Sequence, residues 1–271
     1  MRFINKSIVK KFILCLIIAA TCVSTGCKNN ASNAVKPIGI ISAFDAELQL
    51  LLDNATITKK ETIGGVEFNI GKLEGKDVVM AMAGVGKVLS ASTTSTIINK
   101  YNIGSLIFTG IAGGVGDNVK VLDVVVADDL IQHDYGTVTN DGFVWAGDAG
   151  VDPKTGLIPV DKALSDEAYN AAVSVVGQGD AFRGTIVTGD QFIASESYVE
   201  QLHTNFQALA TEMEGASVAR VAYSFGVPTA IIRCMSDKAD GLAHQTIAQF
   251  GDKAANISAS IVIEMLKNQS K

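Results

Sequence analysis

Three carboxylates in one stretch of the sequence are spaced so that they could share a reaction. Glu212 and Glu214 open an expected helix at 215–225, and Asp237 follows an apolar strand expected at 229–235. In an α/β unit the helix runs down one face of the sheet and the next strand runs back, so the helix start and the strand end meet at one edge. Open α/β sheets bind ligands at that edge. The pattern therefore predicts that Glu214 and Asp237 face one cleft, where carboxyl groups can donate and accept protons.

The same acids also have a purely structural interpretation. Acids in the first turn of a helix stabilise its dipole, and Asp237 could cap the segment that follows it. Around Glu214 alone, the sequence supports the two interpretations about equally. Arg233 precedes Asp237 in the same strand and adds a cation to the group. A cation among three carboxylates favours a functional site.

A further carboxylate, Glu47, follows another expected strand. Residues 38–42 form a short apolar run typical of a buried strand, and a helical pattern begins near residue 48. Glu47 thus lies at or just after the carboxyl end of that strand. An acid that stabilises the first turn of a helix is the commoner meaning of such a position, so the position alone does not assign Glu47 a role.

Small residues and a long polar segment mark two other places where a ligand could approach. The strand expected at 103–111 runs into TGIAGG at 109–114, where small side chains permit close approach to the backbone or form a tight turn. Residues 140–161 are rich in Gly, Asp and Pro and read as a long loop, a kind of segment that is often functional.

Two further motifs and the histidines give no support for a phosphate-binding loop, a catalytic His–Asp pair or a metal site. GVGK at 84–87 lacks the following hydroxyl residue of a phosphate-binding loop, because Val88 stands there. His133 and Asp134 are neighbours on an extended chain and point to opposite sides, so we interpret them as structural. The three histidines stand in unrelated contexts, and we expect no metal (His133, His203 and His244).

The amino terminus differs from the rest of the 271-residue chain. Four basic residues precede the apolar run 12–20, and no acid occurs before Gly26, which is the layout of a secretory signal at 1–26. The segment ends in VSTGC and resembles a bacterial lipoprotein signal with Cys27 as the lipid-bearing residue. Residues 27–36 look like a tether. We expect an exported, lipid-anchored protein with one domain at 37–271.

Charge and cysteine content exclude several classes of protein. Removal of residues 1–26 leaves 18 of the 22 basic residues against 28 acids, a net charge of −10, which argues against a nucleic-acid partner. After cleavage and acylation, Cys234 is the one remaining thiol, so an intrachain disulfide and a four-thiolate zinc site are both excluded.

Five stretches together resemble the 5′-methylthioadenosine/S-adenosylhomocysteine nucleosidases of the nucleoside phosphorylase superfamily. They occur in the family's order and span residue 38 to about residue 266. The stretches are IGIISAFDAEL from Ile38, TGIAGG from Thr109, TGDQFI from Thr188, ATEMEGA from Ala210 and IRCMSDKAD from Ile232. The resemblance implies a nucleoside phosphorylase-like, three-layer αβα sandwich with a central mixed sheet, a homodimer, a nucleoside substrate and no cofactor.

The resemblance also implies roles for the acids. Asp237 looks like the general acid that protonates the purine at N7, and Ser236 orients it. Glu47 looks like the group that positions and deprotonates the attacking water. Glu214 resembles the carboxylate that binds the ribose hydroxyls, assisted by the backbone of Met213.

Other site residues follow from the same resemblance. Arg233 looks like the family residue near the water and the sugar. Phe192 is expected to stack on the base, and Ile193 to offer backbone hydrogen bonds to the adenine edge. Glu212 and Gly113 complete the expected substrate site.

These residue types suit the cleavage of an N-glycosidic bond. Positive charge develops on the ribose and negative charge on the departing base, so carboxylates at the sugar and an acid at the base stabilise opposite ends. Asp237 must hold a proton near neutral pH, which requires burial and neighbouring negative charge. At Ile111 many nucleosidases of this type have Ser, so the preferred 5′ substituent stays open.

Two alternatives remain at this point. A purine nucleoside phosphorylase would need cations for phosphate, but no Arg or Lys occurs between residues 38 and 54, which favours water as the nucleophile. A nucleoside-binding lipoprotein without catalysis would have no use for both an acid and a base, so Glu47 together with Asp237 counts against it.

Overall fold

A computed structural model describes residues 35–148, 151 and 155–269. The expected signal segment, Cys27 and nearly all of the tether lie outside the described residues. The strands are β1 (Ile38–Ser42), β2 (Thr56–Ile63), β3 (Val66–Leu73), β4 (Lys76–Met82), β5 (Ser105–Gly114), β6 (Val124–Gln132), β7 (Gly136–Thr139), β8 (Gly142–Trp145), β9 (Ile158–Pro159), β10 (Ala181–Thr188), β11 (Ala208–Glu212) and β12 (Thr229–Asp237). The helices are α2 (Asp45–Asn54), α3 (Lys87–Tyr101), α4 (Lys162–Val176), α5 (Glu196–Phe206), α6 (Gly215–Ser224) and α7 (Ala243–Asn268).

In the described part of the chain, ten strands form one mixed sheet. Its order is β11-β10-β6-β12-β5-β1-β4-β3-β2, and β9 pairs with β6. The strands β4, β1, β5 and β12 pair in parallel, one after the other. Strand β12 is antiparallel to β6, and β2, β3 and β4 are joined as antiparallel neighbours. Every residue of β12 is buried. A strand buried on both faces has a continuous run of apolar residues, and residues 229–235 show this pattern in the sequence.

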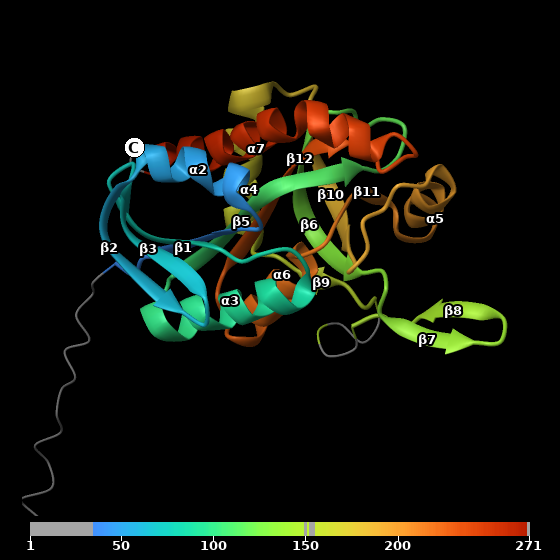
Figure 1. Ribbon diagram of the computed structural model, residues 1–271, viewed down its shortest axis with the longest axis horizontal. Helices are drawn as coiled ribbons and strands as arrows, with labels where there is room; N and C mark the ends of the chain where they lie inside the picture. Colours follow the sequence, from blue (N-terminus) through green and yellow to red (C-terminus); the bar gives the residue numbers. More distant parts are fainter. Residues whose placement is uncertain (1–34, 149–150, 152–154, 270–271) are drawn as a thin grey trace, which may run out of the picture. The chain divides into compact units, whose positions relative to one another are not determined.

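Helices cover both faces of the sheet (Figure 1). On one face α2, α4 and α7 pack together over a core that includes Ile40, Ile107 and Ile232. On the other face α3 and α6 pack over a core that includes Ile41, Phe108 and Ile231. Neighbouring residues of one strand thus enter opposite cores, as the pleat requires. The predicted three-layer αβα sandwich with a central mixed sheet is confirmed.

One end of the sheet curls back on its middle. Strand β11 pairs with β10 on one side and, through Ala210–Gly114 and Thr211–Gly113, with β5 on the other. The stretch TGIAGG therefore continues as strand and does not form the tight turn considered above. A Cβ at position 113 would lie 2.8 Å from the Ala239 Cβ and 3.1 Å from an Asp237 carboxylate oxygen. Glycine is required there because the segment 237–239 approaches its backbone closely.

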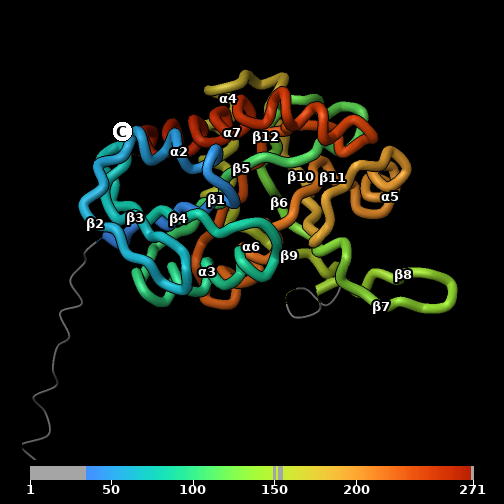
Figure 2. The backbone as a smooth tube through the Cα atoms, viewed as in Figure 1, coloured from blue at the N-terminus to red at the C-terminus, as the bar shows by residue number. Residues whose placement is uncertain are grey.

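The structure corrects two expectations about secondary structure. Glu212 ends strand β11 and is not in the first turn of a helix, although Glu214 does occupy the N-cap position of α6. Residues 140–161 are not one long loop, because 136–145 form the hairpin β7–β8, which extends from the sheet in Figure 2, and 158–159 form β9. Of the helices in the described residues, none is long and apolar enough to cross a membrane.

Candidate active site

A cavity of about 190 Å³ opens at the carboxyl ends of β1, β5, β11 and β12. This is the edge at which the sequence predicted that the acids meet. Its walls combine acids with apolar side chains. The lining residues are Ala43, Phe44, Glu47, Val85, Ile111, Ala112, Gly113, Phe192, Thr211, Glu212, Met213, Glu214, Ser236, Asp237 and Ile247. The prediction that Glu214 and Asp237 face one cleft is confirmed.

Asp237 ends strand β12 and is 2% exposed. The Ser236 hydroxyl donates to one of its carboxylate oxygens at 2.7 Å, and the Ala239 amide donates to the other at 2.7 Å. Burial raises the pKa of Asp237 above its usual value, and these two hydrogen bonds oppose only part of that effect. A carboxyl group held in this way can keep a proton and deliver it into the cavity.

Glu47 lies across the cavity wall in the first turn of α2. The Ala43 amide donates to its Oε2 at 2.7 Å, and the Ile111 amide donates to its Oε1 at 2.8 Å. Its Oε2 also accepts from the Phe44 amide at 3.2 Å, at the N-cap of α2, so the structural interpretation given above holds as well. Burial raises the pKa of Glu47, and the positive charge of Arg233 offsets part of this rise. A buried carboxylate with a raised pKa is suited to accept a proton.

Two more acids surround a buried cation at the floor of the site. The Arg233 guanidinium is completely buried, contacts the Phe108 ring at 4.2 Å and binds Glu212 closely, with Glu214 at 3.3 Å. Arg233 is not among the lining residues, so it lies behind the carboxylates and not on the cavity wall. Burial, together with the negative charge of Glu212, raises the pKa of Glu214 to about 7.

Glu212 is fixed by its neighbours on both sides. The Thr188 hydroxyl donates to its Oε1, and the amides of Glu214 and Gly215 donate to its Oε2 at 3.0 and 2.7 Å. The four first amides of a helix have no partner inside the helix, and here an acid of the preceding strand satisfies the beginning of α6. The Gly86 amide binds the Oε1 of Glu214 at 2.8 Å, which joins the β4–α3 loop to the site.

The aromatic side of the cavity is formed by Phe192, whose side chain is 44% exposed. Its ring stacks on His244 with a centroid distance of 4.5 Å. Next to the cavity, a hollow of about 30 Å³ is lined by Gln191 and Ile193, and it shares Phe192, Met213 and Asp237 with the larger cavity. The cavity and the hollow are both lined by expected site residues, so the two spaces together make one candidate site.

The sequence predicted most of the residues that line the site, but not all of them. The cavity wall holds the expected residues Asp237, Ser236, Glu47, Glu214, Glu212, Met213, Phe192 and Gly113, and Ile193 lines the hollow beside it. Sequence reasoning missed Phe44, Val85, Thr211 and Ile247. Phe44 adjoins the first expected strand end and Val85 lies in the GVGK turn, so both were near recognised features. The structure gives His133 and Asp134 separate partners, Tyr198 and Lys87.

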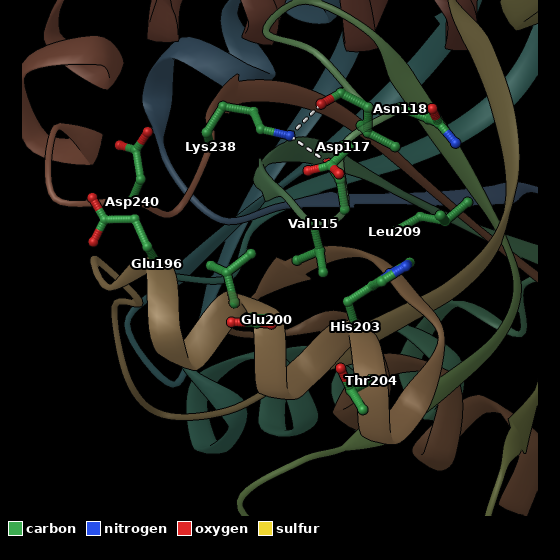
Figure 3. A pocket seen from close by; sticks show the side chains of 13 residues that line it. Val115, Asp117, Asn118, Glu196, Glu200, His203, Thr204, Leu209, Lys238 and Asp240 are labelled. Atoms are coloured by element: carbon green, nitrogen blue, oxygen red, sulfur yellow. Dashed lines mark hydrogen bonds between the residues drawn. The ribbon is translucent and has the colours of Figure 1, made fainter.

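Another hollow in the described residues is larger than this cavity. A groove of about 650 Å³ lies between α5 and the segments 115–119 and 238–240 (Figure 3). Acids line much of it, and Lys238 in its wall donates to the Gly116 carbonyl at 2.6 Å. None of the expected site residues lines this groove. Among the described residues, no group of three or more His, Cys, Asp or Glu side chains is placed to hold a metal ion.

Comparison with known proteins assigns the chain to a family. A sequence profile described as the phosphorylase superfamily matches residues 37–267. The 5′-methylthioadenosine/S-adenosylhomocysteine nucleosidase of Shewanella loihica is 37% identical over 232 residues, which cover 85% of this chain and 99% of that protein. The chain belongs to this nucleosidase family.

Solved structures of the nucleosidase family have the same fold. The Neisseria meningitidis nucleosidase in complex with methylthio-immucillin-A is 34% identical with a TM-score of 0.78, and the match covers 86% of this chain and all of that one (100%). The futalosine hydrolase of Helicobacter pylori is 32% identical with a TM-score of 0.76, covering 86% and 98%. The nucleosidase domain therefore has relatives with two named activities.

Proposed function

We propose that this nucleosidase hydrolyses the N-glycosidic bond of 5′-substituted adenosines and releases adenine and the free sugar. The observation that carries the proposal is the placement of Asp237 and Glu47 on the wall of one cavity, each buried and each with a raised pKa. One can donate a proton to the leaving base while the other accepts a proton from water. The family membership of the chain supports the same reaction.

In this mechanism Asp237 protonates the base as the bond to the sugar lengthens. Its two hydrogen bonds fix the positions of both carboxylate oxygens on the cavity wall. Phe192 is placed to stack on the purine, and Ile193 lies beside it to offer backbone hydrogen bonds to the adenine edge. Protonation removes the negative charge that would otherwise develop on the departing base.

At the sugar, negative charge is concentrated. We expect Glu214 to bind the ribose hydroxyls with Met213, and Glu47 to orient and deprotonate the water that attacks the anomeric carbon. A ribosyl cation-like transition state is stabilised by such carboxylates. Arg233 contributes from behind the wall, because its positive charge makes it possible to bury three acids together.

The lining of the cavity favours water over phosphate as the nucleophile. Among the described residues, no lysine, arginine or histidine lines the cavity, and the nearest guanidinium is already bound by Glu212 and Glu214. A phosphate ion requires cationic or closely spaced amide donors. Acids at the sugar would repel it, so hydrolysis is favoured over phosphorolysis.

A product assay tests the reaction. The purified protein should release adenine and free 5-methylthioribose from 5′-methylthioadenosine at equal rates with and without phosphate. Asp237→Asn keeps the shape but removes the proton donor and should lower kcat by about 10²- to 10⁴-fold. Asp117→Asn, in the separate groove, is the matched control and should be unchanged. Formation of a sugar 1-phosphate only with phosphate, or tight binding without adenine release, would refute the proposal.

The substrate panel must separate neighbouring activities. We propose that 5′-methylthioadenosine, S-adenosylhomocysteine and 5′-deoxyadenosine are substrates, because apolar side chains line the cavity beside the sugar acids (Phe44, Val85, Ile111 and Ile247). Futalosine belongs in the same panel, since a futalosine hydrolase has the same fold. Ile111→Ser should change the ranking of the 5′ substituents more than it changes the rate of the best one.

We also propose that the protein is exported and lipid-anchored to the bacterial membrane through Cys27. The basic and apolar order of residues 1–26 and the VSTGC end support this proposal. Cells that express the protein should incorporate labelled fatty acid into it, and Cys27→Ser should abolish incorporation. Cys15→Ser, in the same segment, is the control. Label that persists in the Cys27→Ser protein would place the anchor elsewhere.

A homodimer completes the proposal. Exposed apolar side chains gather where α3 begins and where the β7–β8 hairpin leaves the sheet (Val85 53%, Val88 78%, Tyr135 54% and Val138 83% exposed). An ion pair between Lys87 Nζ and Asp134 Oδ1, at 2.6 Å, connects the start of α3 with the segment just before β7. Such a surface is typical of an interface. Light scattering should give twice the mass of the chain, and Val88→Glu should give the monomer, whereas Val175→Glu on α4 should not.

A further inference from the structure

The ring of Phe192 has a neighbour that the proposed reaction does not use. Phe192 lines the cavity, and His244 stacks on it with an interplanar angle of 26° and a centroid distance of 4.5 Å. His244 does not line the cavity or the adjoining hollow. The imidazole therefore covers a part of the Phe192 ring that the cavity does not reach.

Phe192 belongs to a loop whose two ends are firmly held. We call residues 189–195 the platform loop. At its start the Asp190 side chain accepts from the Lys87 amide at 2.8 Å, and its own amide donates to Asp134 at 2.9 Å. At its end the Ser195 amide donates to the Ala239 carbonyl at 2.8 Å. These contacts fix the backbone of the loop but not the side chain at its centre.

The rotamer of Phe192 needs a contact of its own. Its side chain is 44% exposed, and a half-exposed aromatic ring keeps rotamer freedom that a ligand must remove when it binds. His244 is in the first turn of α7, seven residues after Asp237 in the chain. The segment that carries the proposed acid therefore also carries the ring that holds Phe192.

We propose that His244 is a positioning residue that backs the Phe192 ring, so that the purine meets a preoriented aromatic platform. This inference rests on the proposed function, since it assumes that the cavity takes a purine against Phe192. In the complex the three rings stack in the order base, Phe192, His244. Offset aromatic pairs at ring distances of about 4.5–7 Å are favourable beyond the area they bury. A flat hydrocarbon ring can replace imidazole in this role, whereas an aliphatic side chain cannot.

The test compares three variants of the full chain. His244→Ala should weaken the equilibrium binding of adenine by about 2- to 10-fold, the change expected from the loss of one aromatic pair. His244→Phe should restore binding to within about twofold of the original protein. Gln245→Ala, an exposed neighbour in the same helical turn, is the matched control. Binding is measured by calorimetry, and thermal melting checks that each variant folds.

A fragment comparison separates positioning from a general structural effect. The affinity for 5-methylthioribose should be the same in the original protein and in His244→Ala, because the stack touches the base and not the sugar. With 5′-methylthioadenosine, His244→Ala should raise KM by the factor seen for adenine and leave kcat within about twofold. A loss of sugar affinity equal to the loss of adenine affinity would overturn the proposal.

Other outcomes are equally decisive. Unchanged adenine binding in His244→Ala, or equally weak binding in His244→Phe, would show that stacking is not what His244 provides. A fall in kcat with unchanged KM would place His244 in the chemistry and refute a positioning role. If the original protein binds adenine but cleaves no nucleoside, the proposed reaction fails while the adenine measurements still decide this inference. If it releases adenine from 5′-methylthioadenosine but does not measurably bind free adenine, the proposed reaction stands and this inference fails.

Discussion

The carboxyl group of Glu214 gives the sharpest quantitative prediction. Its pKa is raised from 4.5 to about 7 by burial and by the negative charge of Glu212. As the pH rises from 4.5 toward 7, the unfolded chain loses this proton first, and the folded protein still holds it. The folded state binds more protons in that window, so its stability falls with increasing pH and levels off above the folded pKa.

The magnitude follows from the two pKa values. Between pH 5 and pH 8 this group lowers the free energy of unfolding by about 2–3 kcal/mol. Glu214→Gln keeps an oxygen for the Gly86 amide, which now binds the carboxylate at 2.8 Å, but it carries no charge to desolvate. The variant should therefore gain about 2–3 kcal/mol relative to the original protein when the pH is changed from 5 to 8.

Urea denaturation at pH 5 and pH 8 measures this difference directly. At each pH the difference in the free energy of unfolding between the variant and the original protein is measured. The change of this difference, or gap, with pH is the useful quantity, because any pH-independent cost of the amide cancels. Glu200→Gln, an exposed acid on α5, is the control and should show a constant gap. A gap for Glu214→Gln that is the same at both pH values would refute the reasoning, since the carboxyl group would then not be penalised by burial.

Three further changes test how the site is held. Arg233→Met leaves buried acids without their cation and should cost about 3–5 kcal/mol in urea denaturation. Gly110→Ala would place a Cβ that overlaps both the Arg233 guanidinium and a Glu47 oxygen, so kcat should fall more than about 10-fold, whereas Gly179→Ala, with open space around it, should be active. Thr188→Val removes the hydroxyl that accepts from the first turn of α6 and should cost about 1–3 kcal/mol, measured by thermal and urea unfolding.

The sequence predicted the parts of the site that depend on one α/β unit. The distance in sequence between Glu214 and Asp237 is covered by α6 and β12, whose lengths follow from local patterns, and these two acids met as expected. Position alone left the role of Glu47 open, because a first-turn acid commonly stabilises its helix. In the structure its carboxylate accepts from the Phe44 amide at the N-cap of α2 and also lines the cavity.

What the sequence did not predict depends on contacts between distant segments. Strand β11 was missed because five residues between two helices carry too short a pattern, and its pairing with β5 brings together residues about a hundred positions apart. The hairpin β7–β8 was hidden by a composition typical of loops. Arg233 was expected near the sugar, and only the packing of β12 against Phe108 shows that its guanidinium lies behind the acids.

The return of β11 onto β5 has a consequence for how copies of this protein can associate. An open sheet normally exposes two rows of unpaired backbone groups, and each row can template a strand of another molecule. Here β11 is paired on both sides near its carboxyl end, which leaves β2 as the remaining outer strand of the series. That strand carries Lys59, Lys60 and Glu61, and charged side chains oppose pairing between strands of different molecules. Association through a continuous intermolecular sheet is thus disfavoured at both margins of this sheet, so the dimer proposed above would form through side chains.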